Sequence, residues 1–147
     1  MSFESSMAGA GVPMRDQAQK LRRALAFSFL RDMLQDPRSA GGIGTPRDTS
    51  RAVSGWTISA GSERRYDPGE GRHSAPNAAD AGRAIGDPPL EQTIFVTDAV
   101  PYIGVLAGGR RMGENGRMVG SEQAPGPFVD QALDKLERLF RGTVERG

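Results

Sequence analysis

The side chains that could perform chemistry are few in this sequence, and they are widely spaced. There is no Cys, which excludes thiol catalysis, disulfides and thiolate metal ligands. The single histidine, His73, stands in a polar stretch without a second metal-binding residue at a suitable spacing. No GxSxG motif presents a serine nucleophile, and no two carboxylates stand out as a general acid and base. The sequence therefore predicts a protein that is not an enzyme and that uses no metal or cofactor.

Glycine-rich and arginine-rich strings raise the question of phosphate binding. GGIGTP at 41–46 and AGGRRMGENG at 107–116 lack the GKS or GKT of a P-loop, so they are typical of flexible connections. Arg110, Arg111 and Arg117 could contact nucleic-acid phosphates, although such a loop more often forms a solvated or partner-facing surface. The net charge of +1 provides no overall attraction to nucleic acid or to an anionic membrane.

Length and composition indicate one domain with extended loops. The 147 residues can bury a single core, but 20 Gly and 10 Pro leave a large part of the chain to loops. We expect a flexible arm over 1–12 and one domain over 13–147, with long loops at 60–90 and 108–125. No signal peptide and no apolar run of roughly 18 residues is present, so we expect a soluble protein made in the cytoplasm, without membrane contact.

Two long helices are predicted, one toward each end of the chain. Residues 14–35 carry apolar side chains around most of the helix circumference in their second half, which indicates burial on more than one side. Phe27, Leu30 and Leu34 are therefore candidates for contact with a second subunit, and one deeply buried core helix is the alternative. Residues 127–142 predict a one-sided amphipathic helix that ends at Gly142.

Between the helices, two short strands and two proline-containing corners are predicted. WTIS at 56–59 and QTIFVT at 92–97 have the composition of strands. In the first corner, Pro46 favours an extended Thr45, and Asp48 or Thr49 can cap a short turn. Trp56 is expected to bury its ring where the first strand begins. Pro101 and Tyr102 are expected to anchor the second strand in the same way, with the phenol at the rim.

Three motifs together resemble the tail-completion, or neck, proteins of long-tailed bacteriophages and gene transfer agents. The matching residues are Thr45, Pro46, Asp48, Thr49, Arg51 and Trp56 in the first motif, Pro101, Tyr102, Leu106 and Gly109 in the second, and Ser121, Gln123, Ala124 and Pro125 in the third. Ser50 and Gly55 stand where Gly and Asn are usual, Thr97 and Asp98 replace an Asn pair, and Ala107 replaces a Glu.

The resemblance implies an α+β fold, with a small and mainly antiparallel sheet flanked by the first and last helices. It also implies a structural protein of the virion, which is made in the host cytoplasm and forms a homo-oligomeric ring at the head–tail junction or at the top of the tail tube. Its partners would be connector or stopper, tail terminator and tail tube proteins, with Arg110 and Arg111 at a contact surface or near DNA in the lumen. A tail terminator or stopper ring protein is the alternative within this class, and a nucleic-acid-binding module that uses the Arg-rich loops is the alternative from another class.

Overall fold

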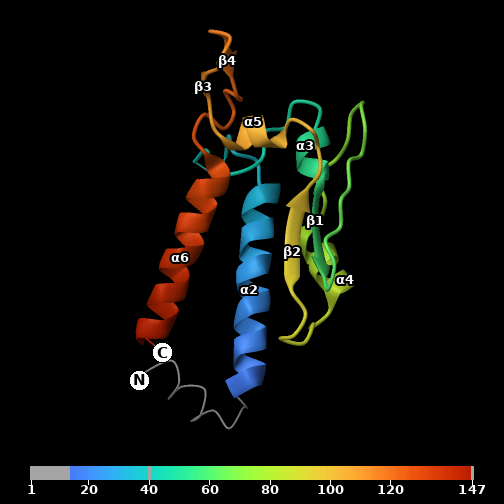
Figure 1. Cartoon of the computed structure of the whole chain (residues 1–147), viewed down its shortest axis with the longest axis vertical. Helices are drawn as coiled ribbons and strands as arrows, with labels where there is room; N and C mark the ends of the chain where they lie inside the picture. The colour runs from blue at the N-terminus through green and yellow to red at the C-terminus, as the bar shows by residue number, and fades with distance from the viewer. Residues whose placement is uncertain (1–13, 40, 147) are drawn as a thin grey trace.

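The computed structural model is an α+β structure with a small antiparallel sheet and a long helix toward each end of the chain, as expected (Figure 1). Both long helices lie on the same side of the sheet, with α2 against it and α6 beyond α2, so they do not flank the sheet as the resemblance implied. It describes residues 14–39 and 41–146, so the expected arm at 1–12 lies outside the described residues. The elements are α2 (Met14–Leu34), α3 (Arg51–Ser54), β1 (Trp56–Ala60), α4 (Ala78–Ile85), β2 (Ile94–Asp98), α5 (Ile103–Ala107), β3 (Arg111–Met112), β4 (Met118–Val119) and α6 (Phe128–Arg146).

The two long helices lie side by side, and α6 is longer than the sequence predicted (Figure 1). Gly142 lies inside α6, which continues to Arg146, so the predicted end at Gly142 is wrong. A single glycine costs a helix only about 1 kcal/mol, and no proline or second glycine follows it before the helix ends.

Lys135 of α6 binds the buried Asp32 of α2, with Nζ 3.2 Å from both carboxylate oxygens. This ion pair links the two helices near the core.

The sheet is formed by β1 and β2 in an antiparallel pairing that confirms both predicted strands. Trp56 stands opposite Asp98, and Ile58 stands opposite Val96. Because side chains alternate along a strand, Trp56 and Ile58 share one face, and both are buried in the core. Thr57 lies on the other face, where its hydroxyl is 3.1 Å from that of Thr97.

The stretch 60–90, predicted to be loop throughout, contains the helix α4. Asn77 caps this helix, since its side-chain oxygen accepts hydrogen bonds from the backbone N–H groups of Ala79 (2.9 Å) and Asp80 (3.2 Å). Gly86 follows the last turn with a positive φ of 62°. The prediction failed because α4 has few large apolar residues, and it packs closely through a small one: a Cβ at Gly82 would overlap the ring of Phe27.

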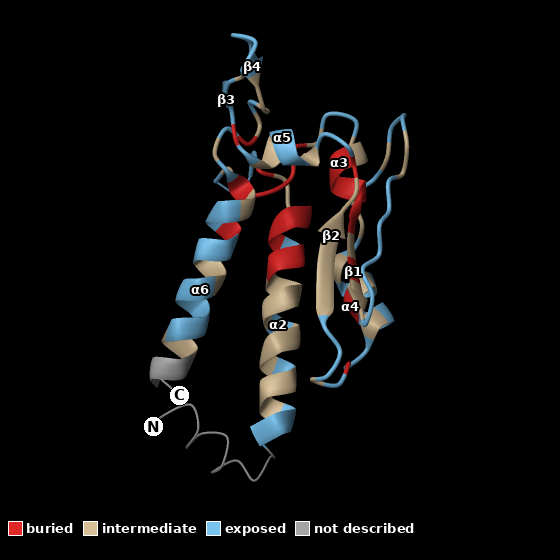
Figure 2. Cartoon of the chain, viewed as in Figure 1, coloured by how far each residue is buried: buried red, intermediate tan, exposed pale blue. Residues whose placement is uncertain are grey.

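The core occupies the end of α2 that adjoins α3, α5 and the start of α6 (Figure 2). Its buried apolar residues are Phe29, Leu30, Met33, Leu34, Val53, Trp56, Ile58, Ala124, Phe128 and Ala132. Leu30 is fully buried and Leu34 is only 7% exposed. Both therefore belong to the subunit's own core rather than to a contact between subunits, which corrects that expectation; Phe27 remains partly exposed.

Candidate functional site

The first motif forms a corner whose two ends are tied into the core. The fully buried Thr45 accepts a hydrogen bond on its hydroxyl from Nε1 of Trp56 at 2.7 Å. Its backbone N–H donates to the carbonyl of Met33 at 3.1 Å. The Trp56 ring meets Phe29 edge to face, with 5.9 Å between ring centroids. The expected anchoring role of Trp56 is confirmed, and Thr45 supplies the polar partner that the buried indole needs.

The turn that follows is capped differently from the prediction. Ser50, not Asp48 or Thr49, precedes α3, and it adopts a left-handed conformation with φ of 64° and no side-chain cap. Thr49 contributes only a long contact, from the N–H of Arg51 to its hydroxyl at 3.4 Å. Left-handed φ favours glycine because it has no Cβ. A glycine at position 50 would therefore fit this conformation better than the serine does.

Arg51 joins the first motif to the second. Its guanidinium binds Asp67 through two hydrogen bonds of 2.9 and 2.6 Å and lies over the Tyr102 ring, 5.6 Å from the centroid. The Arg51 hydrogen bonds, with one from the N–H of Gly69, lower the pKa of Asp67 to about 2. Partial burial raises the pKa of Tyr102, and the Arg51 charge opposes this shift. Asp67 is a partner that sequence reasoning missed, because it lies in the unpatterned 60–90 stretch.

The third motif is joined to the first through Gln123. Its side-chain oxygen accepts a hydrogen bond of 2.8 Å from the backbone N–H of Arg47, and its own backbone N–H donates to the Ser121 hydroxyl at 3.1 Å. Pro125 accepts a 2.7 Å hydrogen bond from the N–H of Arg110 on its carbonyl. Hydrogen bonds thus hold together segments that are far apart in the sequence.

The three motifs surround one open groove at the α3–α5 end of the molecule. Its volume is about 610 Å³. The lining residues are Pro46, Asp48, Thr49, Ser50, Arg51, Ala52, Glu70, Gly71, Tyr102, Leu106, Gly120, Ser121, Glu122 and Gln123. Tyr102 is 37% exposed and so lies at the rim, as expected. The wall mixes hydroxyl, amide and both signs of charge, which suits recognition by shape and hydrogen bonding.

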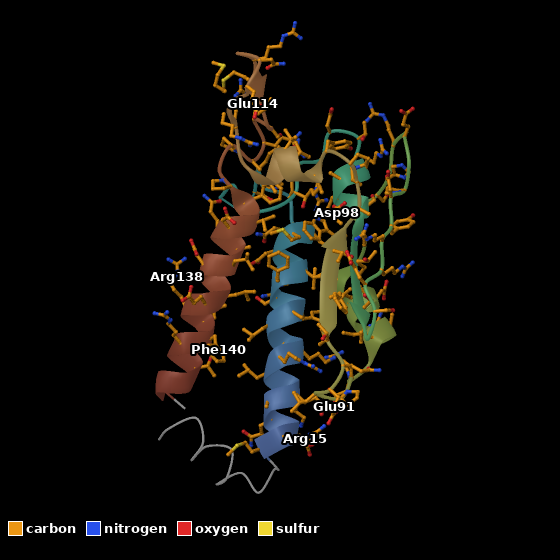
Figure 3. The ribbon with its side chains drawn as sticks, viewed as in Figure 1. Arg15, Glu91, Asp98, Glu114, Arg138 and Phe140 are labelled. Carbon is orange, nitrogen blue, oxygen red and sulfur yellow. The ribbon has the colours of Figure 1, made fainter. Side chains whose placement is uncertain are left out.

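Asp98 is the most perturbed carboxyl group among the described residues, and the sequence did not single it out as a functional group. It ends β2 beside α3 (Figure 3). One carboxylate oxygen accepts a 2.9 Å hydrogen bond from the N–H of Val100, whereas the other is buried without a hydrogen-bond partner among the described residues. Burial raises the pKa of Asp98 to about 7, although the Val100 bond opposes this. The shift comes from burial in the folded chain, which the spacing of residues in the sequence does not reveal.

Three other residues that the sequence predicted for the site do not have the roles expected of them. Pro101 is exposed, so it is not buried beneath β2 as expected. Arg110 forms an ion pair of 2.6 Å with Glu122. Arg111 donates to the carbonyls of Val105 (3.1 Å) and Gly109 (2.9 Å). Both arginines therefore have intramolecular partners, and this weakens the case for a phosphate-binding surface.

Within residues 14–39 and 41–146, no group of three or more His, Asp or Glu side chains could hold a metal ion. None of the helices described is long and apolar enough to cross a membrane.

No family model, curated protein or solved structure matches the chain. The resemblance to neck proteins therefore rests on the three sequence motifs alone.

Proposed function

We propose that this chain is a structural protein of a tailed phage or phage-like particle, and that it forms part of a ring at the head–tail junction or at the top of the tail tube. The observation that carries the proposal is the convergence of the three motifs on one groove. The first and third motifs are 76 positions apart at Arg47 and Gln123, yet they are hydrogen-bonded. The three motifs, which are separate in the sequence, thus form one continuous surface in the folded chain.

The contacts inside this surface suit assembly better than catalysis. Arg51 is held by Asp67 and stacked on Tyr102, and the side-chain oxygen of Gln123 is bound to the backbone of Arg47. These groups stiffen the rim, whereas an enzyme would aim them at a reacting atom. A rigid, open groove with mixed polarity can receive a segment of a neighbouring protein, because pre-organisation reduces the entropy lost on binding.

The partners proposed are further copies of this chain and the adjacent connector, terminator or tail tube proteins. The protein would be made in the host cytoplasm and incorporated into the virion. A ring component acts through shape, so this role requires no cofactor.

Cryo-electron microscopy of particles tests the proposed location. We expect density for this chain between the portal and the tail tube. Density in the capsid shell or at the tail tip would contradict the proposal.

Genetic complementation tests the proposed role of the groove. Deletion of the gene should leave filled heads and tails that do not join, and the wild-type chain should restore joined particles. Arg51→Ala should restore far fewer, because the rim loses its contacts to Asp67 and Tyr102. Arg83→Ala is the matched control, because Asp80 on α4 is the only ion-pair partner of Arg83 among the described residues, and both side chains are exposed. Equal complementation by both variants would remove the groove from the proposal.

A further inference from the structure

One face of α6 carries large apolar side chains that the described chain leaves about half exposed. Phe128 and Ala132 are fully buried, but Leu133 is 49% exposed and Phe140 is 43% exposed. The α2 and α6 ribbons diverge toward the C-terminal end of α6, where Phe140 lies (Figures 1 and 3). An exposed row of large apolar side chains on a helix is typical of a contact with another protein.

Acidic residues border this surface on the side of Leu133. Asp130 precedes Leu133 by three residues and Glu137 follows it by four, so both are its neighbours on the helix surface. Glu137 binds the exposed Arg141 at 2.6 Å, whereas Asp130 has no ion-pair partner in the described part of the chain. At 1.5 Å per residue, the two carboxylates are separated by about 10 Å along the helix axis.

A hollow of about 310 Å³ lies on a side of α2 to which α6 contributes no lining residue. It is lined by Arg23, Ala24, Phe27, Ser28 and Arg31. Arg23 and Arg31 stand at its two ends, about 12 Å apart along the helix axis, with Ala24, Phe27 and Ser28 between them.

The hollow is held in shape by α4. The close approach of Gly82 fixes one side of the Phe27 ring. Arg23 lies over that ring, 5.6 Å from the centroid, and donates to the carbonyls of Gly82 and Gly86. Arg31 is exposed and has no ion-pair partner among residues 14–39 and 41–146. The surface is therefore pre-formed, with one of its charges uncommitted.

We infer that α6 of one copy docks onto α2 of the next copy through these two surfaces. Leu133 would cover Phe27, and the carboxylates of Asp130 and Glu137 would meet the guanidinium groups of Arg23 and Arg31. The charges are opposite in sign and nearly equal in spacing on the two helices. The two surfaces are different parts of the same chain, so the contact is head to tail and its repetition gives a ring or a filament. Closure into a ring rests on the proposed function.

Disulfide crosslinking tests the contact directly, because the chain contains no Cys. The full-length double variant Ala24→Cys/Leu133→Cys should form a ladder of dimers, trimers and larger species on non-reducing gels after mild oxidation. Each single variant can yield a dimer at most, and a disulfide within one chain would migrate as a monomer. Met112→Cys/Leu133→Cys is the matched control and should not form the ladder, because the exposed Met112 lies on β3, away from the hollow. Absence of the ladder from the first variant, or an equal ladder from the control, overturns the inference.

Charge reversal tests the pairing. Arg31→Glu should weaken self-association in sedimentation experiments by about fivefold, since a partly exposed ion pair contributes little more than that. Adding Glu137→Arg should restore association if the helices dock in parallel, and adding Asp130→Arg should do so if they dock antiparallel. If neither second change restores it, the inference fails.

The inference and the proposed function can fail separately. A chain found in the neck whose double-cysteine variant forms no ladder would keep the function and lose this interface. A ladder from a chain found elsewhere in the particle would keep the interface and lose the neck role.

Discussion

Asp98 lies directly against Gly55. A Cβ at position 55 would be 3.0 Å from Cγ of Asp98 and 2.7 Å from a methyl group of Val100, and closer still to a carboxylate oxygen of Asp98. Both residues are also positions at which the chain differs from the neck-protein pattern that its sequence resembles, and they belong to different motifs. Because the two residues are in contact, the two differences are structurally linked. Gly55 has no side chain, and this leaves room for the carboxyl group of Asp98 where β1 begins and β2 ends.

Gly55→Ala should destabilise the fold by about 1–3 kcal/mol, because an added methyl group overpacks this joint. Urea unfolding of the purified protein measures the change. Gly104→Ala in α5 is the control: its Cβ would meet nothing within 4 Å, and alanine favours a helix. Equal stability of the two variants would show that the joint can relax.

Asp98→Asn should remove a pH dependence of stability. Because the pKa of Asp98 is raised when the chain folds, the native state keeps this proton longer than the unfolded state. Stability should therefore fall as pH rises from 3.8 to about 7. Three pKa units correspond to about 4 kcal/mol for a fully enclosed carboxyl, and we expect about 2 kcal/mol for this partly enclosed one. Urea unfolding at several pH values checks this; an unchanged slope in the variant would assign the effect to another group.

Thr45→Val should cost about 1–3 kcal/mol, because it leaves the buried indole N–H of Trp56 without its acceptor. Trp56→Phe removes that donor, so the cost of Thr45→Val should become much smaller in the Trp56→Phe background. A double-mutant cycle from thermal or urea unfolding measures the coupling. Strictly additive effects would mean that the hydrogen bond contributes nothing.

Ser50→Gly should stabilise the protein by about 1 kcal/mol, because it relieves a left-handed conformation at a residue that has a Cβ. The Ser50 side chain makes no capping bond, so little is lost by its removal. Ser50→Ala is the control and should give no gain, since alanine has the same steric conflict. A similar gain from both variants would trace the effect to the hydroxyl group.

Arg51→Ala should raise the pKa of Asp67 from about 2 toward 3.8, because its hydrogen bonds to Arg51 contribute most to the lowered value. The stabilising effect of this carboxylate is present above pH 3.8 and is lost as pH falls toward 2. An NMR titration of the Asp67 carboxyl group follows the shift. Arg83→Ala, remote from Asp67 on α4, should leave its pKa unchanged. A low pKa that persists in Arg51→Ala would assign it to the backbone of Gly69.

Periodicity and local signals were sufficient for the regular elements. The apolar spacing predicted α2 and α6, and β-branched residues predicted β1 and β2, because these patterns act within a few residues of the chain. The same reasoning missed α4, whose tight packing depends on the absence of a side chain at Gly82. It also ended α6 too early at Gly142, since one glycine is a weak stop without a proline after it.

In the candidate site, too, local features could be predicted from the sequence, whereas contacts between distant segments could not. Residue types were enough to predict the long helices, the two strands, a buried Trp56 and a turn-rich corner at 45–56, because burial and turn preferences are properties of single residues and their near neighbours. Only the folded chain brings Gln123 to Arg47, Asp67 to Arg51 and Asp98 to Gly55. Each of these contacts joins segments at least 16 positions apart. Such contacts form only when the sheet and helices pack together, and no spacing in the sequence encodes them.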